Sequence, residues 1–295
     1  MEHRMKYMVS ADFGQTTDYT AVAVTRRRLV PTSEKYVHEG ERYEGDLYHG
    51  GRAPFRETRQ DVEQHYDLIR LDRVQLRTPY TQIAKGIVKL IKELNALHRK
   101  EDGLRPRQPV DIGLAIDEGG VGKAVKDILV EALEDGIPDQ DGEPHVLFMP
   151  VTVHGGANTT KSGGYYHVPK RDLVHAGIVA FQNGTLRVGK LRYRGVLEEE
   201  LKNYRLKQNL NTGYAAFEPL REGQHDDLLF ATCLGVWAWE RAIEKQEYIS
   251  YPGEWELEGV PVNVVGKLRQ LVTSLTELGG AWRPTGPAGR GHLRV

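Results

Sequence analysis

The alternation of apolar and polar positions predicts a fold of mixed strands and helices. Short apolar runs typical of buried strands cover residues 6–12, 19–25, 110–116 and 145–151. The first two runs are separated only by a turn-like stretch, which predicts an antiparallel hairpin. Further strand-like pieces occur at 34–48 and 65–76, separated by a polar connection. Helical spacing of apolar residues predicts helices that begin near residues 79, 122, 170, 197 and 224.

This order of elements predicts an α/β domain with a mixed sheet that is flanked by helices. Residues 1–244 are expected to form that domain. From about residue 245 Tyr, Trp, Pro and Gly accumulate, so 245–295 is expected to be a C-terminal extension, partly helical and then disordered. The helical part is expected at 264–278.

Composition narrows the class of protein. The chain has 295 residues, of which 39% are hydrophobic, and a net charge of -1. That charge excludes a chain that is basic throughout, although a local basic face suffices for nucleic acid. A single cysteine, Cys233, excludes an internal disulfide framework and fits a reducing compartment. There is no apolar run of about 18 residues and no signal-peptide core, so we expect a cytoplasmic protein without a membrane partner.

Acidic residues stand at informative places in this pattern. Asp12 and Asp117 end predicted strands, and Asp226-Asp227 opens the last predicted helix. Ligands of open α/β sheets bind at the carboxyl ends of the strands, so these acids are expected to meet there, with Asp18 as an additional one. Carboxylates held together repel one another, which favours hard divalent cations and two-metal phosphoryl transfer. The alternative for the Asp pair is a simple helix cap.

The motifs Asp12-Phe-Gly, Asp18-Tyr-Thr-Ala, Ala-Ile-Asp117-Glu-Gly-Gly and His-Asp226-Asp227-Leu-Leu-Phe-Ala occur in this order. The set resembles the nuclease domain of tailed-phage large terminase subunits, over roughly residues 5–243. That resemblance implies a ribonuclease H-like fold and a metal-dependent DNA endonuclease with two Mg²⁺ or Mn²⁺ ions. It implies as catalytic metal ligands Asp12, Asp117, Asp226 and Asp227, with Asp18 near the metals. We expect Asp12 to bridge the ions, and favour Asp226 over Asp227 as a ligand and Asp117 over Glu118.

The resemblance also implies partners. They are double-stranded or branched DNA and, among proteins, a separate packaging ATPase, a small terminase subunit or a portal, in a bacterial host with a phage or prophage gene. The sequence departs from the pattern of a complete terminase subunit, and because only eleven residues precede Asp12 we expect the ATPase to be supplied by a separate protein. Its one Walker-like stretch, 117–124, has Asp117 for the first Gly and Ala124 for the Ser or Thr that would hold Mg²⁺.

A basic segment between residues 161 and 194 is a candidate for DNA contacts. It carries seven cationic residues against Asp172 alone, and such side chains position phosphates. The alternative is a solvated face with extended side chains. The residues that we predict to contact DNA are Lys161, Lys170, Arg171, Lys190, Arg192 and Arg194.

Two other functions stay open from the sequence. Asp12-Phe-Gly14-Gln-Thr16 also fits the phosphate loop of an actin/sugar-kinase-like, ATP-dependent phosphotransferase. Such proteins normally need two halves of this fold, and the sequence contains no duplication. The third hypothesis is a catalytically silent scaffold that binds DNA or a packaging motor.

Overall fold

The computed structural model describes residues 5–14, 18–44, 51–104, 110–138, 142–208, 215–219, 225–243 and 246–251. The chain divides into two compact units. The first comprises residues 1–36 and 59–250, and the second comprises 37–58 and 251–295. The described part of the second unit is mainly β3 (Tyr36–Glu44), from its second residue on, paired with the first portion of β4 (Gly51–Arg73). The predicted boundary at residue 244 stays a prediction.

The first unit is built on a mixed sheet. Its central strands are β1 (Tyr7–Asp12), β2 (Ala21–Pro31), β5 (Asp111–Asp117), β6 (His145–His154) and β8 (Tyr165–Pro169). Their order, together with β4, is β4-β2-β1-β5-β6-β8. β2 lies antiparallel to β1 and β4, whereas β1, β5, β6 and β8 run parallel. The predicted mixed sheet with an N-terminal antiparallel hairpin is therefore confirmed.

Short strands complete the structure. β7 (Thr160–Ser162) pairs with β8, whereas β9 (Leu186–Val188) and β12 (Tyr248–Tyr251) pair with β4. β10 (Tyr204–Gln208) and β11 (Ala215–Pro219) form a separate two-stranded ribbon.

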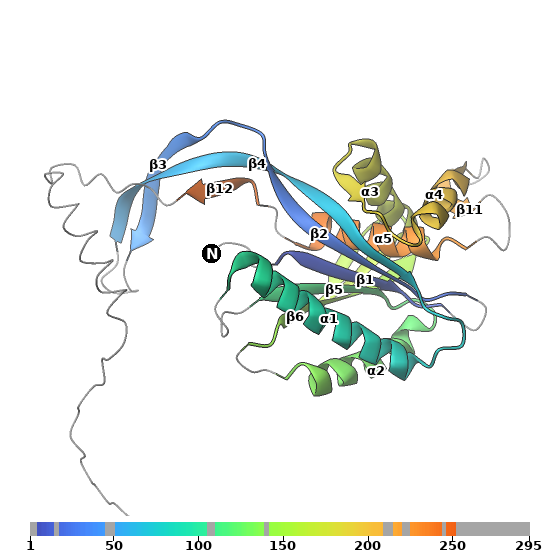
Figure 1. Cartoon of the computed structure of the whole chain (residues 1–295). Coiled ribbons are helices and arrows are strands. Elements are labelled where there is room, and N and C mark those ends of the chain that lie inside the picture. Colours follow the sequence, from blue (N-terminus) through green and yellow to red (C-terminus); the bar gives the residue numbers. More distant parts are fainter. Residues whose placement is uncertain are drawn as a thin grey trace, which may run out of the picture. The chain divides into compact units, whose positions relative to one another are not determined.

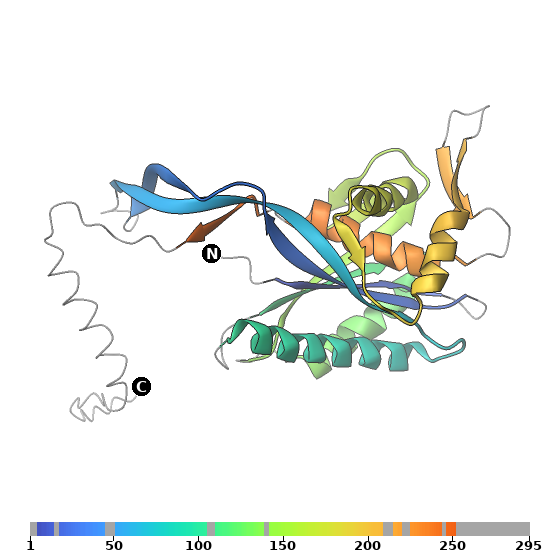
Figure 2. The ribbon, with the colours of Figure 1, turned by 45° about the horizontal axis from the view of Figure 1, so that its top comes forward.

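Helices cover both faces of the sheet, as Figures 1 and 2 show. α1 (Tyr80–Asp102) and α2 (Gly122–Gly136) lie on one face. α3 (Lys170–Gln182), α4 (Arg194–Asn203) and α5 (Asp227–Trp237) lie on the other. Strand alternation divides the side chains between these two layers. On β1, Tyr7 and Val9 join the core with α1 and α2, whereas Met8 joins the core with α3 and α5.

α5 is the central helix of its layer. Every residue from Asp227 to Trp237 is buried, as expected for a helix that is apolar on all sides. Small side chains let it approach β1 closely: Ser10 Oγ donates to the carbonyl of Ala231 at 2.7 Å. A Cβ on Gly235 would lie 2.8 Å from Ser10 Oγ, so this close packing requires glycine. The helix continues as a π-helical turn, η1 (Ala238–Ala242).

One sequence prediction needs correction. The strand pieces predicted at 34–48 and 65–76 are instead β3 and an unbroken β4 that begins at Gly51. The polar composition of the predicted connection reflects a half-exposed strand, whose later part pairs with β2 along the whole length of β2, with one irregularity in the register. Within the predicted extension, 248–251 forms β12, and residues 252–295, including the helix predicted at 264–278, lie outside the described residues. Of the helices that the structure describes, none is long and apolar enough to cross a membrane.

Candidate active site

The acids of the site come from three blocks of the sequence, namely Asp12, Asp117 and the Asp226-Asp227 pair. The sheet brings the acids of the first two blocks together. β1 and β5 are parallel with Ala11 opposite Ile116, so Asp12 and Asp117 are neighbours at the same carboxyl edge. Alternation along the two strands places these acids on the face of Met8 and Ala115, which pack against α3 and α5. The third acidic block opens α5 on that face, and the three blocks therefore meet at one edge.

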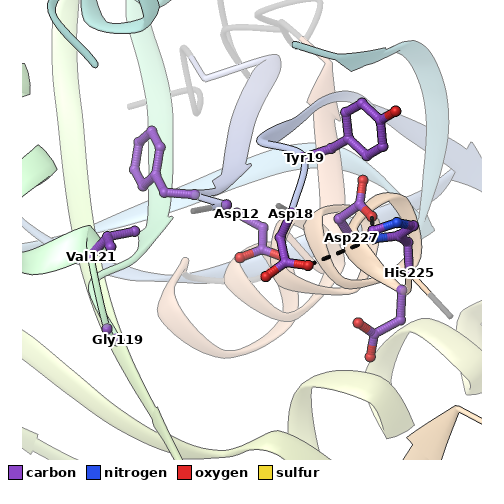
Figure 3. A pocket seen from close by; sticks show the side chains of 11 residues that line it. Asp12, Asp18, Tyr19, Gly119, Val121, His225 and Asp227 are labelled. Atoms are coloured by element: carbon purple, nitrogen blue, oxygen red, sulfur yellow. Dashed lines mark ion pairs between the residues drawn. The ribbon is translucent and has the colours of Figure 1, made fainter. Parts of the chain in front are cut away.

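An acid-lined cavity lies at this edge. Its volume is about 410 Å³. Figure 3 shows Asp12, Asp18, His225 and Asp227 gathered on one side, and Gly119 and Val121 on the other. The full lining is Asp12, Phe13, Gly14, Asp18, Tyr19, Gly119, Gly120, Val121, His225, Asp226 and Asp227.

Asp117 lies beside Asp12 but does not line the cavity. Its Oδ1 accepts a hydrogen bond from the Gly119 backbone N–H at 2.8 Å, which turns the carboxylate toward its own loop. Burial raises the pKa of Asp117, although the backbone hydrogen bonds oppose the rise. The neighbouring Glu118 pairs with Lys126 at 3.4 Å, so Asp117 is the acid of this loop whose charge acts on Asp12.

The negative charges of the site converge on Asp12. Burial raises the pKa of Asp12 well above its ordinary value, and the charges of Asp117, Asp226 and Asp227 raise it further, while Lys170 opposes them. A carboxyl surrounded in this way holds its charge only at a cost, which a nearby cation relieves.

Lys170 supplies one such cation. It is the first residue of α3 and directly follows β8, so it enters at the same carboxyl edge as Asp12. Its Nζ lies 2.9 Å from Asp226 Oδ2. The structure thus places this predicted DNA-contacting lysine against the carboxylates of the site.

The two aspartates that open α5 have different surroundings. The Asp226 side chain is 24% exposed and pairs with Lys170, whereas the Asp227 side chain is 7% exposed. Arg73 holds Asp227 at two points, through Nε to Oδ2 at 2.8 Å and through Nη2 to Oδ1 at 3.1 Å. Only the second aspartate is therefore fixed to the core of the protein.

The helix cap comes from a residue far away in the sequence. Asp226 occupies the N-cap position of α5 but makes no side-chain capping hydrogen bond. Instead, Glu200 Oε2 of α4 accepts the Leu229 backbone N–H at 2.8 Å, and Oε1 accepts a hydrogen bond from Arg73. Burial raises the pKa of Glu200 to about 7. The side chain that caps α5 is therefore Glu200, and Asp226 does not serve as the helix cap that the alternative interpretation expects.

Arg73 and Glu200 were not predicted from the sequence. A signal for Arg73 exists, because it ends β4 opposite Ala21, which itself lies opposite Asp12. The position of Arg73 can be inferred from this signal only when the pairing of β1, β2 and β4 is known. Glu200 lies on a short helix, and no sequence pattern points to its contact with α5.

Asp18 lies at the mouth of the cavity, with its side chain 64% exposed. His225 connects it to the interior, because His225 Nδ1 lies 3.8 Å from Asp18 Oδ1 and 4.0 Å from Asp227 Oδ1 (Figure 3). The Tyr19 ring meets the His225 ring edge to face, with their centroids 5.4 Å apart.

The donor set suits hard divalent cations, which prefer carboxylate oxygens. In the side-chain positions of the described residues, however, no three His, Cys, Asp or Glu side chains stand close enough to hold a metal ion. The assignment of these acids as metal ligands stays a prediction. In their described positions each carboxylate has another partner: Asp117 contacts Gly119, Asp226 contacts Lys170 and Asp227 contacts Arg73.

The other predicted DNA-contacting residues lie in two regions. Lys161 on β7 and Arg171 on the first turn of α3 form one region, and Arg171 also donates to the Ala157 carbonyl at 2.6 Å. Lys190 and Arg192, together with Arg194 at the start of α4, form the other. Arg194 pairs with Glu198 at 2.8 Å, and this carboxylate compensates part of the positive charge of Arg194.

No protein-family model and no curated protein matches the chain. Among solved structures, the large terminase nuclease from thermophilic phage G20c is 17% identical, with a TM-score of 0.37 and coverage of 80% of this chain and 82% of that one. The human cytomegalovirus terminase nuclease domain, soaked with Mn, is 10% identical, with a TM-score of 0.44 and coverage of 83% and 89%. A second structure of that domain is 12% identical, with a TM-score of 0.44 and coverage of 80% and 83%.

Proposed function

We propose that the chain is a metal-dependent endonuclease that hydrolyses DNA phosphodiester bonds by a two-metal mechanism and serves viral DNA packaging, as its terminase-like motifs imply. The observation that carries the proposal is the meeting of three acidic blocks at one edge of the sheet, with their charges acting on Asp12. Asp12, Asp117 and Asp226 would hold the ions, with Asp227 and Asp18 beside them. Two bound divalent ions supply an activated water and stabilise the leaving oxygen.

The residues around these acids have distinct tasks in the proposal. Arg73 keeps Asp227 at the start of α5, so the last acidic block stays at the edge of the sheet. Lys170 balances the carboxylates and would contact a phosphate oxygen of the strand. The cavity is open to DNA at its mouth, where the exposed Asp18 lies.

The phosphotransferase alternative receives no support from the fold. It needs two duplicated halves, whereas the described residues contain one mixed sheet and a small two-stranded ribbon. A negatively lined cavity also disfavours a nucleotide polyphosphate unless cations accompany it.

Cleavage of supercoiled plasmid in Mn²⁺ or Mg²⁺ tests the proposal. The wild type should nick and linearise the plasmid, EDTA should abolish this activity, and Asp12→Asn should lower it at least about a hundredfold. Asp111→Asn is the matched control, because Asp111 begins the strand that Asp117 ends and lies at the opposite edge. Full cleavage by the Asp12→Asn variant would refute the assignment.

A further inference from the structure

A second cavity, which shares no lining residue with the acidic one, lies beside α3. Its volume is about 500 Å³. Lys161 of β7, His175 of α3 and Arg241 of η1 line it, together with the buried rings of Tyr166 and Trp237. Those two rings meet edge to face at 5.4 Å and form an apolar wall. We call this hollow the α3 cavity.

The two cationic side chains of its lining, Lys161 and Arg241, are not neutralised, and His175 adds a ring nitrogen to the lining. Lys161, His175 and Arg241 are exposed, and none of them forms an ion pair within the described part of the chain. The contact that Lys161 makes is with the Tyr166 ring, at 4.7 Å from its centroid. Uncompensated cations around one hollow favour an anionic ligand.

The single acid of the lining does not cancel this charge. Asp172 Oδ2 accepts a hydrogen bond from Thr159 at 3.1 Å, and Asp172 Oδ1 lies 3.5 Å from Arg171 Nε. Both carboxylate oxygens are therefore engaged with groups of the protein. The cavity retains a net positive charge, with the hydroxyl of Thr160 as a further donor in its lining.

These groups fit a phosphate group with its sugar. Lysine and arginine bind phosphate oxygens through charge-assisted hydrogen bonds, and arginine can bind two oxygens at once. The volume lies within the range of about 300–1,000 Å³ that is typical of pockets for small organic ligands. A nucleotide unit of a strand therefore has room in it.

The position of the α3 cavity connects it with the acidic site. Lys170, paired with Asp226, and His175, in the second cavity, are both on the first part of α3. Five residues of helix correspond to about 7.5 Å along the axis and about 140° around it. The first part of α3 thus contributes Lys170 beside the acidic cavity and, on a different side of the helix, His175 to the α3 cavity, so a strand that passes this part of α3 would meet both.

We propose that the α3 cavity binds a backbone phosphate of the DNA strand whose scissile bond is positioned at the acidic cavity. The proposal rests on the proposed function in that the ligand is the same DNA. It adds a positioning site that holds the strand in register, with Lys161 and Arg241 as its main phosphate contacts and His175 as a third donor.

DNA binding without cleavage tests this proposal. Fluorescence anisotropy of a short labelled duplex is measured in EDTA, with salt varied between about 50 and 200 mM. The double variant Lys161→Gln/Arg241→Gln should bind about tenfold more weakly at the lower salt concentration. The slope of log Kd against log salt should fall by about two, one for each lost contact. In the single variant Lys161→Gln, this slope should fall by about one.

Lys89→Gln is the matched control, since Lys89 is 80% exposed on α1, on the other face of the sheet. It should keep the wild-type affinity and slope. A double variant with wild-type affinity and slope would overturn the proposal, as would a wild type that does not bind DNA. If the wild type binds DNA but does not cut it with Mn²⁺ or Mg²⁺, only the proposed function fails. If cleavage is normal while the slope of the double variant is unchanged, only the α3 cavity proposal fails.

Discussion

Arg73 and Asp227 form a largely buried two-point ion pair that joins the sheet to α5 at the edge of the acidic cavity. The contacts measure 2.8 Å and 3.1 Å, and the two side chains are 15% and 7% exposed. Such two-point pairs fix direction as well as distance. The pair therefore holds the first residue of α5 in place and accounts for the burial of Asp227.

Removing the guanidinium should destabilise the fold. In Arg73→Gln, Asp227 and Glu200 remain close together without their shared cation, and breaking a buried pair typically costs about 3–5 kcal/mol. Urea unfolding measures the change. Arg70→Gln on the same strand is the control, because Arg70 is 48% exposed and its surface pair with Asp72 is worth at most about 1 kcal/mol. Similar losses in both variants would contradict the role of Arg73.

Substitutions of the two adjacent aspartates should change the free energy of unfolding by different amounts. Asp227→Asn removes the carboxylate that Arg73 contacts at two points, leaves Arg73 with Glu200 alone, and should lower the free energy of unfolding by about 2 kcal/mol. Asp226→Asn breaks a half-exposed pair with Lys170 and should change it by less than about 1 kcal/mol. Both variants should lose plasmid cleavage if the proposed function is right. Equal stability of the two variants would show that Arg73 does not distinguish the two carboxylates.

Asp12 should reveal metal binding without any activity assay. Its pKa is raised, so its ionised form at neutral pH opposes folding, and Asp12→Asn should raise the melting temperature in EDTA. Mn²⁺ should stabilise the wild type, by about 2.7 kcal/mol at a hundred times Kd, and should stabilise Asp12→Asn much less. Asp111→Asn should respond to Mn²⁺ as the wild type does. An equal Mn²⁺ response in Asp12→Asn would argue against Asp12 as a ligand.

The placement of Asp12 and Asp117 could be predicted because it depends on local patterns. Each follows a short apolar run, and the two-residue period of a strand fixes its face. The contacts of Arg73 could not be predicted, because they join residues 127 and 154 positions apart. They also depend on how β4 pairs with β2, and that register includes an irregularity between Val24 and Thr25. The polar composition of β4 concealed its length.

The directions of the side chains at the site also could not be predicted from the sequence. Spacing gives the position of Asp117 on its strand but not the hydrogen bond to Gly119 that turns its carboxylate. It likewise identifies Lys170 as a cation without showing that Asp226 is its partner. Both outcomes are decided by neighbours from other elements or by the local loop conformation, which hydrophobic periodicity does not encode.

A second charged contact gives a prediction on pH. Asp67 accepts hydrogen bonds from Arg28 at 2.7 Å and Arg26 at 3.0 Å, between β4 and β2. Burial disfavours the charge of Asp67, but the two guanidiniums outweigh this effect, and its pKa lies below the ordinary value of 3.8. A lowered pKa contributes stability that is present above the unfolded value and is lost as the pH falls through the folded one.

Asp67→Asn should therefore lower the free energy of unfolding at neutral pH, by about 1–2 kcal/mol given its partial exposure. The difference from the wild type should shrink as the pH falls below about 4, because the wild-type carboxyl then takes up its proton. Urea unfolding at neutral and acidic pH gives both values. Asp72→Asn, whose side chain is 44% exposed on the same strand, should stay within about 0.5 kcal/mol of the wild type at neutral pH. If the loss in Asp67→Asn is the same at both pH values, the ionised carboxylate is not the source of the stabilisation.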